Sequence, residues 1–194
     1  MEESATLRER RRLETEHRIT ACAQRLTDER GLDGFTMDEL AEDAEVSRRT
    51  LFNYFPSKID AVLGNPPEVP PDVLATFYAG GPHGHLVDDL GELALVLLSS
   101  KVLDREEMQR GRRIVVTTPR LIVAAHERFE ALAGEFVEMI LTREGPDFGA
   151  ERARLLVQLF VALFDGCLPT QEGDDRPLAD VFLHQLRLAR ELLV

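Results

Sequence analysis

The sequence predicts an all-α protein. Apolar residues recur at helical spacing along most of the chain, and no run of alternating β-branched residues indicates a strand. Glycine and proline separate the helical segments. Hydrophobic residues make up 44% of the 194 positions, which is enough for a proper core. We expect about nine helices, in a small N-terminal domain and a larger C-terminal one.

The N-terminal part should begin with one longer helix and continue with short ones. The longer helix is predicted from about Leu13 to Arg30. Thr36 and Glu39 form a capping box, which starts a helix of about two turns. Ser47 is a natural N-cap for the next helix, over 48–54. A fourth short helix follows, and the N-terminal domain is predicted over 8–64.

The two short helices between about Thr36 and Tyr54 are joined by a brief break, as in a helix-turn-helix unit. In that motif the later helix enters the major groove of DNA. Leu51 and Phe55 fall on its apolar face, and Ser47 with the helix start offers backbone N–H groups to an anion. The opposite face carries side chains suited to phosphates and base edges: Arg48, Arg49, Thr50, Asn53 and Tyr54.

Residues 65–84 are rich in proline and glycine and are predicted as a connector with about one helical turn near 73–78. The C-terminal domain, 85–194, should be helical throughout. Its last two helices, about 148–168 and 177–193, carry apolar stripes too wide for a monomer surface. We therefore predict a homodimer through these helices and a near-palindromic operator. The stripes are Phe160, Leu163 and Phe164 on one helix and Val181, Leu188 and Leu192 on the other.

The central helices carry many apolar and few polar side chains, which is typical of a pocket for a largely apolar ligand. Leu97 and Phe129 are candidates for its wall. Arg113 and His126 lie near these faces and can hydrogen-bond an anionic or carbonyl end of a ligand. The alternative is a filled core with no natural ligand.

Three stretches also follow a known pattern: RI..CAQRL...RG in the first helix, then FTMDELAEDAEVS, then RRTLFNYFPSK. Over Arg18 to Gly64 the chain resembles the N-terminal domain of TetR-family repressors, and the YFPSK ending is especially specific. The resemblance implies a homodimer on an operator, dimerisation through the last two helices, and release of DNA when a ligand binds among the middle ones. It places the DNA contacts on Thr36, Arg48, Arg49, Thr50, Asn53, Tyr54 and Lys58.

Two positions depart from this resemblance. Glu45 stands where the turn usually has glycine, so we expect an unfavourable positive φ that costs roughly 1 kcal/mol. Phe52 stands where the helix often has tyrosine, which removes a hydroxyl bond to phosphate.

The net charge of −12 opposes nucleic-acid binding unless basic groups gather on one face. We expect such a face from Arg48, Arg49 and Lys58 together with an arginine arm ahead of the first helix, provided that the acids at 38–43 point elsewhere. The arm consists of Arg8, Arg10, Arg11 and Arg12.

Other functional classes find little support. The chain has no motif of a hydrolase, metalloprotease or phosphate loop, so no enzymatic activity and no cofactor are expected. His83 and His85 lack further metal ligands nearby. Cys22 and Cys167 are expected to be reduced, and without a secretory or membrane-spanning segment the predicted location is the cytoplasm. Two alternatives stay open, namely an interaction protein whose helix-turn-helix no longer reads DNA and a helical enzyme.

Overall fold

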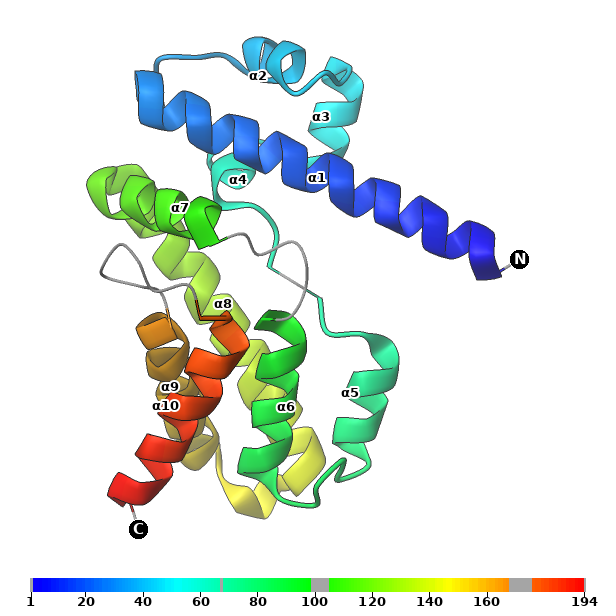
Figure 1. The fold of residues 1–194 in the computed structure, drawn as a ribbon, viewed down its shortest axis with the longest axis vertical. Helices are drawn as coiled ribbons and strands as arrows, with labels where there is room; N and C mark the ends of the chain where they lie inside the picture. The colour runs from blue at the N-terminus through cyan, green and yellow to red at the C-terminus, as the bar shows by residue number, and fades with distance from the viewer. Residues whose placement is uncertain (1, 67, 99–104, 168–175, 194) are drawn as a thin grey trace. The chain divides into compact units, whose positions relative to one another are not determined.

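A computed structural model of the chain describes residues 2–66, 68–98, 105–167 and 176–193 (Figure 1). Over these residues the protein is all-α, as predicted, with no strand. It has ten α-helices and one 3₁₀ helix: α1 (Glu2–Arg30), α2 (Met37–Asp43), α3 (Arg48–Tyr54), α4 (Lys58–Leu63), α5 (Pro71–Tyr78), α6 (Leu86–Leu98), α7 (Arg105–Thr117), α8 (Pro119–Glu144), η1 (Pro146–Phe148), α9 (Ala150–Cys167) and α10 (Leu178–Leu193).

Two helices differ from the expectation. The segment predicted as a connector with about one helical turn contains α5, which begins with proline at its first position. Helix α1 starts at Glu2 rather than near Leu13. Arg10, Arg11 and Arg12 therefore belong to a helix and do not form an arm ahead of it. The side chain of Arg8 lies outside the described part.

The described residues divide into two compact units. The N-terminal unit comprises 2–66 and 105–126, and the C-terminal unit comprises 68–98, 127–167 and 176–193. Helix α7 and the first two turns of α8 thus pack with the N-terminal helices, although they lie far along the chain. Helix α8 contributes its two ends to different units.

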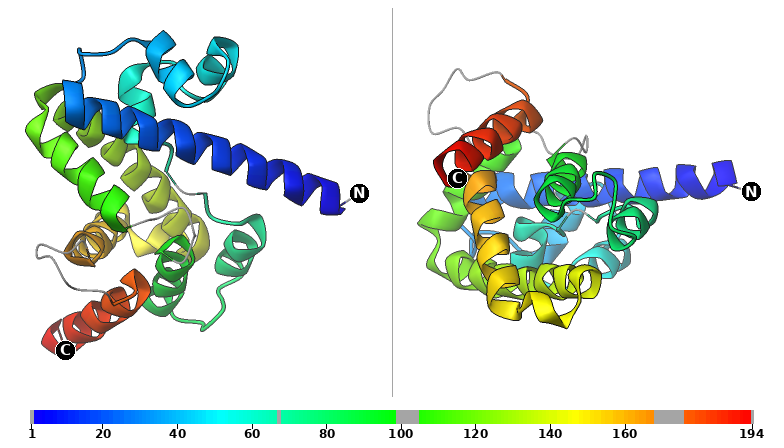
Figure 2. Two further views of the ribbon diagram at one scale, coloured as in Figure 1. Left: turned by 45° about the horizontal axis from the view of Figure 1, so that its top comes forward. Right: turned by 90° about the horizontal axis from the view of Figure 1, so that it is seen from below.

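The core of the N-terminal unit forms around α1. Figures 1 and 2 show α1 running between the α2–α3 pair and α7. Ile19 and Leu26 of α1 are fully or almost fully buried in the same cluster as Leu51 of α3. Ile114 of α7 and Leu121 of α8 belong to the same buried cluster. The short helices, each too brief to be stable alone, are held by this burial.

The C-terminal unit packs α6 and α9 against α10, with a core that includes Phe77, Leu93 and Ile140. It also buries an ion pair. The side chain of Asp89 on α6 is completely buried, and that of Arg143 on α8 is 4% exposed. Arg143 donates to one Asp89 oxygen, and the other accepts the backbone N–H of His83 at 2.6 Å.

The surroundings of this pair favour its charged form. Burial by itself raises the pKa of Asp89, but the hydrogen bonds from His83 and Arg143 and the positive charge of Arg143 hold it below its ordinary value. The guanidinium of Arg143 also lies over the Phe77 ring, 4.5 Å from its centroid. The pair therefore joins α6 and α8 with the loop before α6.

Replacing Asp89 tests this link. Asp89→Asn should lower the free energy of unfolding at pH 7 by about 3–5 kcal/mol, because it removes the buried partner of Arg143 and leaves that charge only its ion pair with the partly exposed Glu144. The folded-state pKa of Asp89 lies below the unfolded value of about 3.9. The ionised carboxylate thus stabilises the fold above about pH 4, and this contribution disappears as the pH falls through the folded-state pKa. Urea titrations between pH 2 and 7 should show a larger loss of stability in the wild type than in the variant, in which only the other carboxylates with lowered pKa, such as Asp43, still contribute.

Asp88→Asn is the matched control, because Asp88 pairs with Arg190 at a partly exposed site. It should change the free energy of unfolding by less than about 1 kcal/mol. Equal losses in the two variants would contradict the role assigned to Asp89.

Candidate nucleic-acid interface

Side-chain caps fix where α2 and α3 begin. The Thr36 hydroxyl accepts the Glu39 backbone N–H at 3.1 Å, and the Glu39 carboxylate accepts the Thr36 backbone N–H at 2.7 Å. This is the predicted capping box. The Ser47 hydroxyl accepts the Thr50 backbone N–H at 3.0 Å and bonds the Thr50 hydroxyl at 2.7 Å. The hydroxyls of Thr36, Ser47 and Thr50 are therefore used within the protein.

The turn between α2 and α3 is a Schellman motif. The backbone N–H of Val46 bonds the Ala41 carbonyl at 2.9 Å, and that of Glu45 bonds the Glu42 carbonyl at 3.0 Å. Glu45 occupies the left-handed position with φ 53°, as its place in the sequence predicted. The turn thus keeps the geometry that glycine usually provides, at a backbone cost of roughly 1–2 kcal/mol.

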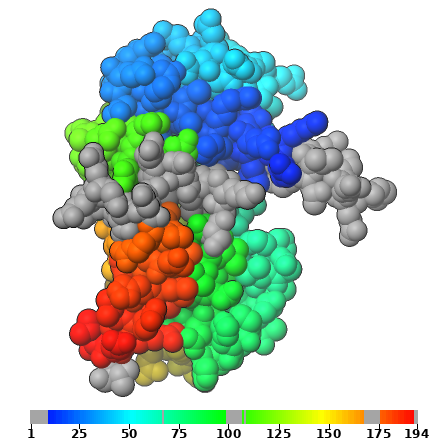
Figure 3. Space-filling view, viewed as in Figure 1, coloured from blue at the N-terminus to red at the C-terminus, as the bar shows by residue number. Residues whose placement is uncertain are grey.

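Helix α3 has one buried and one exposed face. Leu51 and Phe55, which directly follows the helix, are fully buried in the N-terminal core, and Thr50 and Tyr54 are partly covered. The exposed side chains form two stripes at helical spacing: Arg48 with Phe52, and Arg49 with Asn53. Figure 3 shows the α2–α3 region, light blue to cyan, at the surface of the N-terminal unit.

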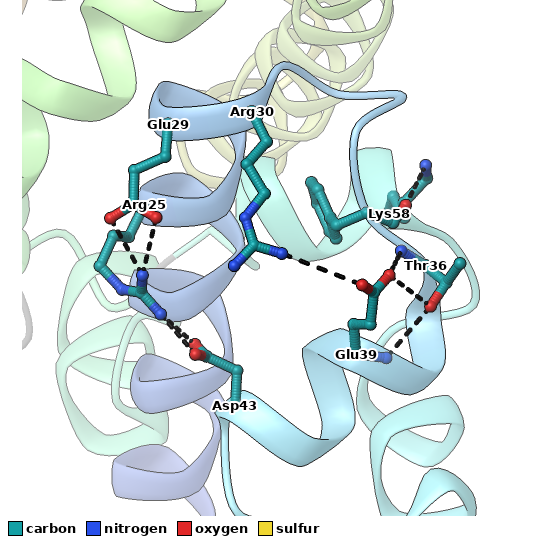
Figure 4. A network of polar contacts seen from close by, with 8 residues as sticks. Arg25, Glu29, Arg30, Thr36, Glu39, Asp43 and Lys58 are labelled. Carbon is teal, nitrogen blue, oxygen red and sulfur yellow. Dashed lines mark hydrogen bonds and ion pairs between the residues drawn. The ribbon is translucent and has the colours of Figure 1, made fainter.

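Ion pairs neutralise much of the acidic charge on α2. Asp38 pairs with Arg48 at 3.2 Å, and Glu39 lies 3.9 Å from Arg30. Asp43 pairs with Arg25 at 2.5 Å (Figure 4). The Arg25 guanidinium holds the pKa of Asp43 below its ordinary value, and the Thr36 backbone N–H does the same for Glu39.

Both arginines of α3 are exposed, but only one of them forms an ion pair within the described part of the chain. Arg48 is engaged by Asp38, whereas Arg49 has no ion-pair partner among the described residues. Arg49 and Asn53 lie one turn apart on the exposed face. A guanidinium and an amide at this spacing can each make two hydrogen bonds to a base edge, guanine for arginine and adenine for asparagine.

Lys58, the first residue of α4, has a structural role as a hydrogen-bond donor to backbone carbonyls. Its ammonium donates to the backbone carbonyls of Leu32 and Phe35 at 2.7 and 2.8 Å and lies 5.0 Å from the centroid of the Phe35 ring. It therefore ties α4 to the loop between α1 and α2. Two of its three N–H donors are used in this way, so its contact with DNA stays a prediction.

The four residues predicted to bind a ligand are not gathered at one pocket. Arg113 pairs with Asp28 at 2.8 Å in the N-terminal unit, where His126 is also exposed. Phe129 is more than one third exposed, and Leu97 is half-buried on α6. None of the four lines either of the two pockets described next.

Both pockets lie in the C-terminal unit. One, of about 160 Å³, lies between α5 and α6. Its apolar wall is formed by Val73, Phe77, Leu93 and Val96. Its polar lining residues are Asp72, Thr76, Asp89 and Glu92. The other, of about 310 Å³, lies between α6 and α10 and is more polar. Sequence reasoning missed the first because it treated 65–84 as a connector, although Val73 and Phe77 are four apart, as in a helix.

One comparison with known proteins identifies the family of the N-terminal domain. Residues 19–60 match the family model described as bacterial regulatory proteins, tetR family. The N-terminal domain is that of a tetR-family regulator. The matched range contains both caps, the Schellman turn and the whole of α3. A search of the curated proteins finds no match to this chain.

The match supports a DNA-binding transcriptional regulator, and α3 lies wholly within the matched residues. Proteins of this family generally bind DNA without catalysing a reaction. In the described part of the chain, no helix is both long enough and apolar enough to cross a membrane.

The turn gives a direct test of the local geometry. Glu45→Gly should raise the free energy of unfolding by about 0.5–1 kcal/mol, because relief of the left-handed strain exceeds the entropy that glycine adds to the unfolded chain. Glu42→Gly, three residues earlier and inside α2, should lower it by about 1 kcal/mol. Urea denaturation measures both. A loss of stability in both variants would contradict the strained turn.

Proposed function

We propose that the protein is a cytoplasmic transcriptional repressor that binds a near-palindromic operator as a homodimer and leaves it when a small, largely apolar effector binds. Residues 8–64 would bind DNA, 65–84 would connect, and 85–194 would dimerise and hold the effector. The observation that carries the proposal is the solvent-facing pair Arg49 and Asn53 on a helix whose opposite face is fully buried.

The charge distribution supports specific rather than loose DNA binding. The protein is acidic overall, yet three acids of α2 are paired with arginines: Asp38 with Arg48 of α3, and Glu39 and Asp43 with Arg30 and Arg25 of α1. Repulsion between the acidic body and phosphate would weaken attachment to random sequence. The hydrogen bonds that Arg49 and Asn53 make to matching bases would offset this repulsion on the operator alone.

Apolar surface on the last two helices supports dimerisation. Leu155 and Leu159 on α9 and Leu188 and Leu192 on α10 are at least 42% exposed, and each pair is spaced four residues apart. Of the stripes predicted from sequence, Val181 is buried within the unit, so the candidate contact has shifted toward these leucines. A second copy of the chain would cover them in an isologous four-helix interface.

A competing reading is an interaction protein whose helix-turn-helix no longer reads DNA. The acidic net charge, Glu45 and Phe52 favour it. Against it, the Schellman turn is formed at Glu45 without glycine. The exposed pair Arg49 and Asn53 supports the DNA-reading alternative.

The function is tested on an operator selected from random duplexes with the full chain. Arg49→Ala should lose about 1–3 kcal/mol of affinity for that operator and little for a scrambled duplex, because a bidentate base contact is lost. Arg154→Ala, an exposed arginine on α9, is the control and should bind as the wild type does. Fluorescence titrations at fixed salt give the affinities. Operator binding by Arg49→Ala at the wild-type level would place the base-reading surface elsewhere.

The same operator should be protected as two related half-sites whose centres lie about one helical turn or slightly more apart. Sedimentation of the unliganded protein at micromolar concentration should give twice the chain mass of 21.8 kDa. A monomer would contradict the homodimer while leaving the tetR-family domain intact.

The effector is proposed to bind in the α5–α6 pocket, since its wall of Val73, Phe77, Leu93 and Val96 is largely apolar. Release of DNA requires that the effector bind the DNA-incompetent state more tightly. Helix α8 is a candidate for transmitting that change, because Leu121 lies in the N-terminal core and Ile140 in the C-terminal core.

A screen of lipophilic acids, acyl thioesters and aromatic drugs tests the effector. An effector should raise the melting temperature by mass action and weaken operator binding. Val96→Phe fills the pocket and should raise the effector concentration needed for both effects at least tenfold. Val116→Phe, at an exposed site of α7, should leave that concentration unchanged. Release by strongly polar compounds alone would contradict the apolar pocket.

A further inference from the structure

Phe52 is the only large hydrophobic side chain of α2 or α3 that is exposed, at 42% of its surface. It is not part of the buried N-terminal cluster or of the partly buried shell around it. The fold therefore does not require a phenyl ring at this position. On the face proposed to read DNA, the exposed part of this ring can contact an apolar group of a bound duplex.

The ring is held from one side. The guanidinium of Arg48, one turn earlier, lies 5.6 Å from the centroid of the Phe52 ring. Asp38 of α2 holds that guanidinium at 3.2 Å. These two side-chain contacts, from Asp38 to Arg48 and from Arg48 to Phe52, restrict the ring while leaving much of it open to solvent.

The neighbours of Phe52 determine where its ring goes in a complex. Arg49 is three residues earlier and Asn53 is the next residue, and both are exposed on the same side of α3. A docking that brings Arg49 and Asn53 to base edges therefore also brings the Phe52 ring into the major groove. A phenyl ring has no hydrogen-bonding group. The apolar group that a base pair presents in the major groove is the 5-methyl of thymine.

We propose that Phe52 selects a thymine in each half-site of the operator by packing its ring against the 5-methyl group, beside the bases bound by Arg49 and Asn53. This inference rests on the proposed operator binding and adds one base to what the helix reads. The substitution of phenylalanine for the usual tyrosine is then an exchange of a phosphate contact for a base contact.

The test removes the methyl group alone. In the selected operator, each thymine is replaced in turn by uracil, which keeps all hydrogen-bonding groups. Replacement at one position, the same in both half-sites, should lower the affinity of the wild type about three- to fivefold per half-site. This is the effect expected for one buried methyl group. Phe52→Ala should bind the thymine operator as weakly as the wild type binds the uracil one, and should not distinguish the two.

Two further variants separate packing from other effects. Phe52→Leu keeps an apolar side chain and should retain part of the discrimination between thymine and uracil. Phe52→Ser should lose it, and because the site is exposed, both variants should melt within a few degrees of the wild type.

The possible results distinguish this inference from the proposed function. The inference would be overturned if uracil replacement lowered operator affinity equally in the wild type and in Phe52→Ala, or if it lowered the affinity of neither. In both cases operator binding itself would stand. Failure to select any duplex with the wild type would instead overturn the proposed function, and the inference with it.

Discussion

The burial of Leu51 and Phe55 is the constraint on which the site depends. Helix α3 has only seven residues and would not be stable by itself. Its apolar face is buried in the core of the N-terminal unit, so the exposed face with Arg49, Phe52 and Asn53 is fixed as well. Burying two large side chains of this kind contributes about 3–6 kcal/mol, which exceeds the cost of the strained Glu45 turn.

The same core joins α3 to α7 and to the beginning of α8. Ile114 of α7 and Leu121 of α8 are buried with Leu51, and Gly111 leaves room for Gln24 of α1, whose amide donates to the Val62 carbonyl at 3.1 Å. Arg120 adds an exposed ion pair with Asp33 at 2.9 Å, which is worth little by itself. The N-terminal unit therefore includes residues far along the chain, from α7 and the start of α8.

Local features of the site were predictable from sequence because they depend on neighbours along the chain. The caps at Thr36 and Ser47, the buried face of α3 and the positive φ at Glu45 all follow from spacings of a few residues. The same holds for the all-α class. These features recur wherever the same short pattern occurs, whatever surrounds it.

Other features depend on tertiary contacts that no local pattern encodes. Ile114 and Leu121 join the N-terminal core, and the Lys58 ammonium bonds two backbone carbonyls more than 20 residues earlier. Arg113 and His126 were assigned to a pocket because they flank apolar residues, yet Arg113 pairs with Asp28 of α1. The α5–α6 pocket was not predicted, because the prolines on both sides of α5 indicate a connector rather than a helix.

The central claim is that the exposed face of α3 lies against DNA bases. Photochemical cross-linking tests it most directly, with the full chain bound to its selected duplex carrying 5-iodouracil in place of individual thymines. The account predicts cross-linked peptides that contain residues 48–54, with Phe52 as the main site. Cross-links confined to other helices, with none in α3, would contradict it.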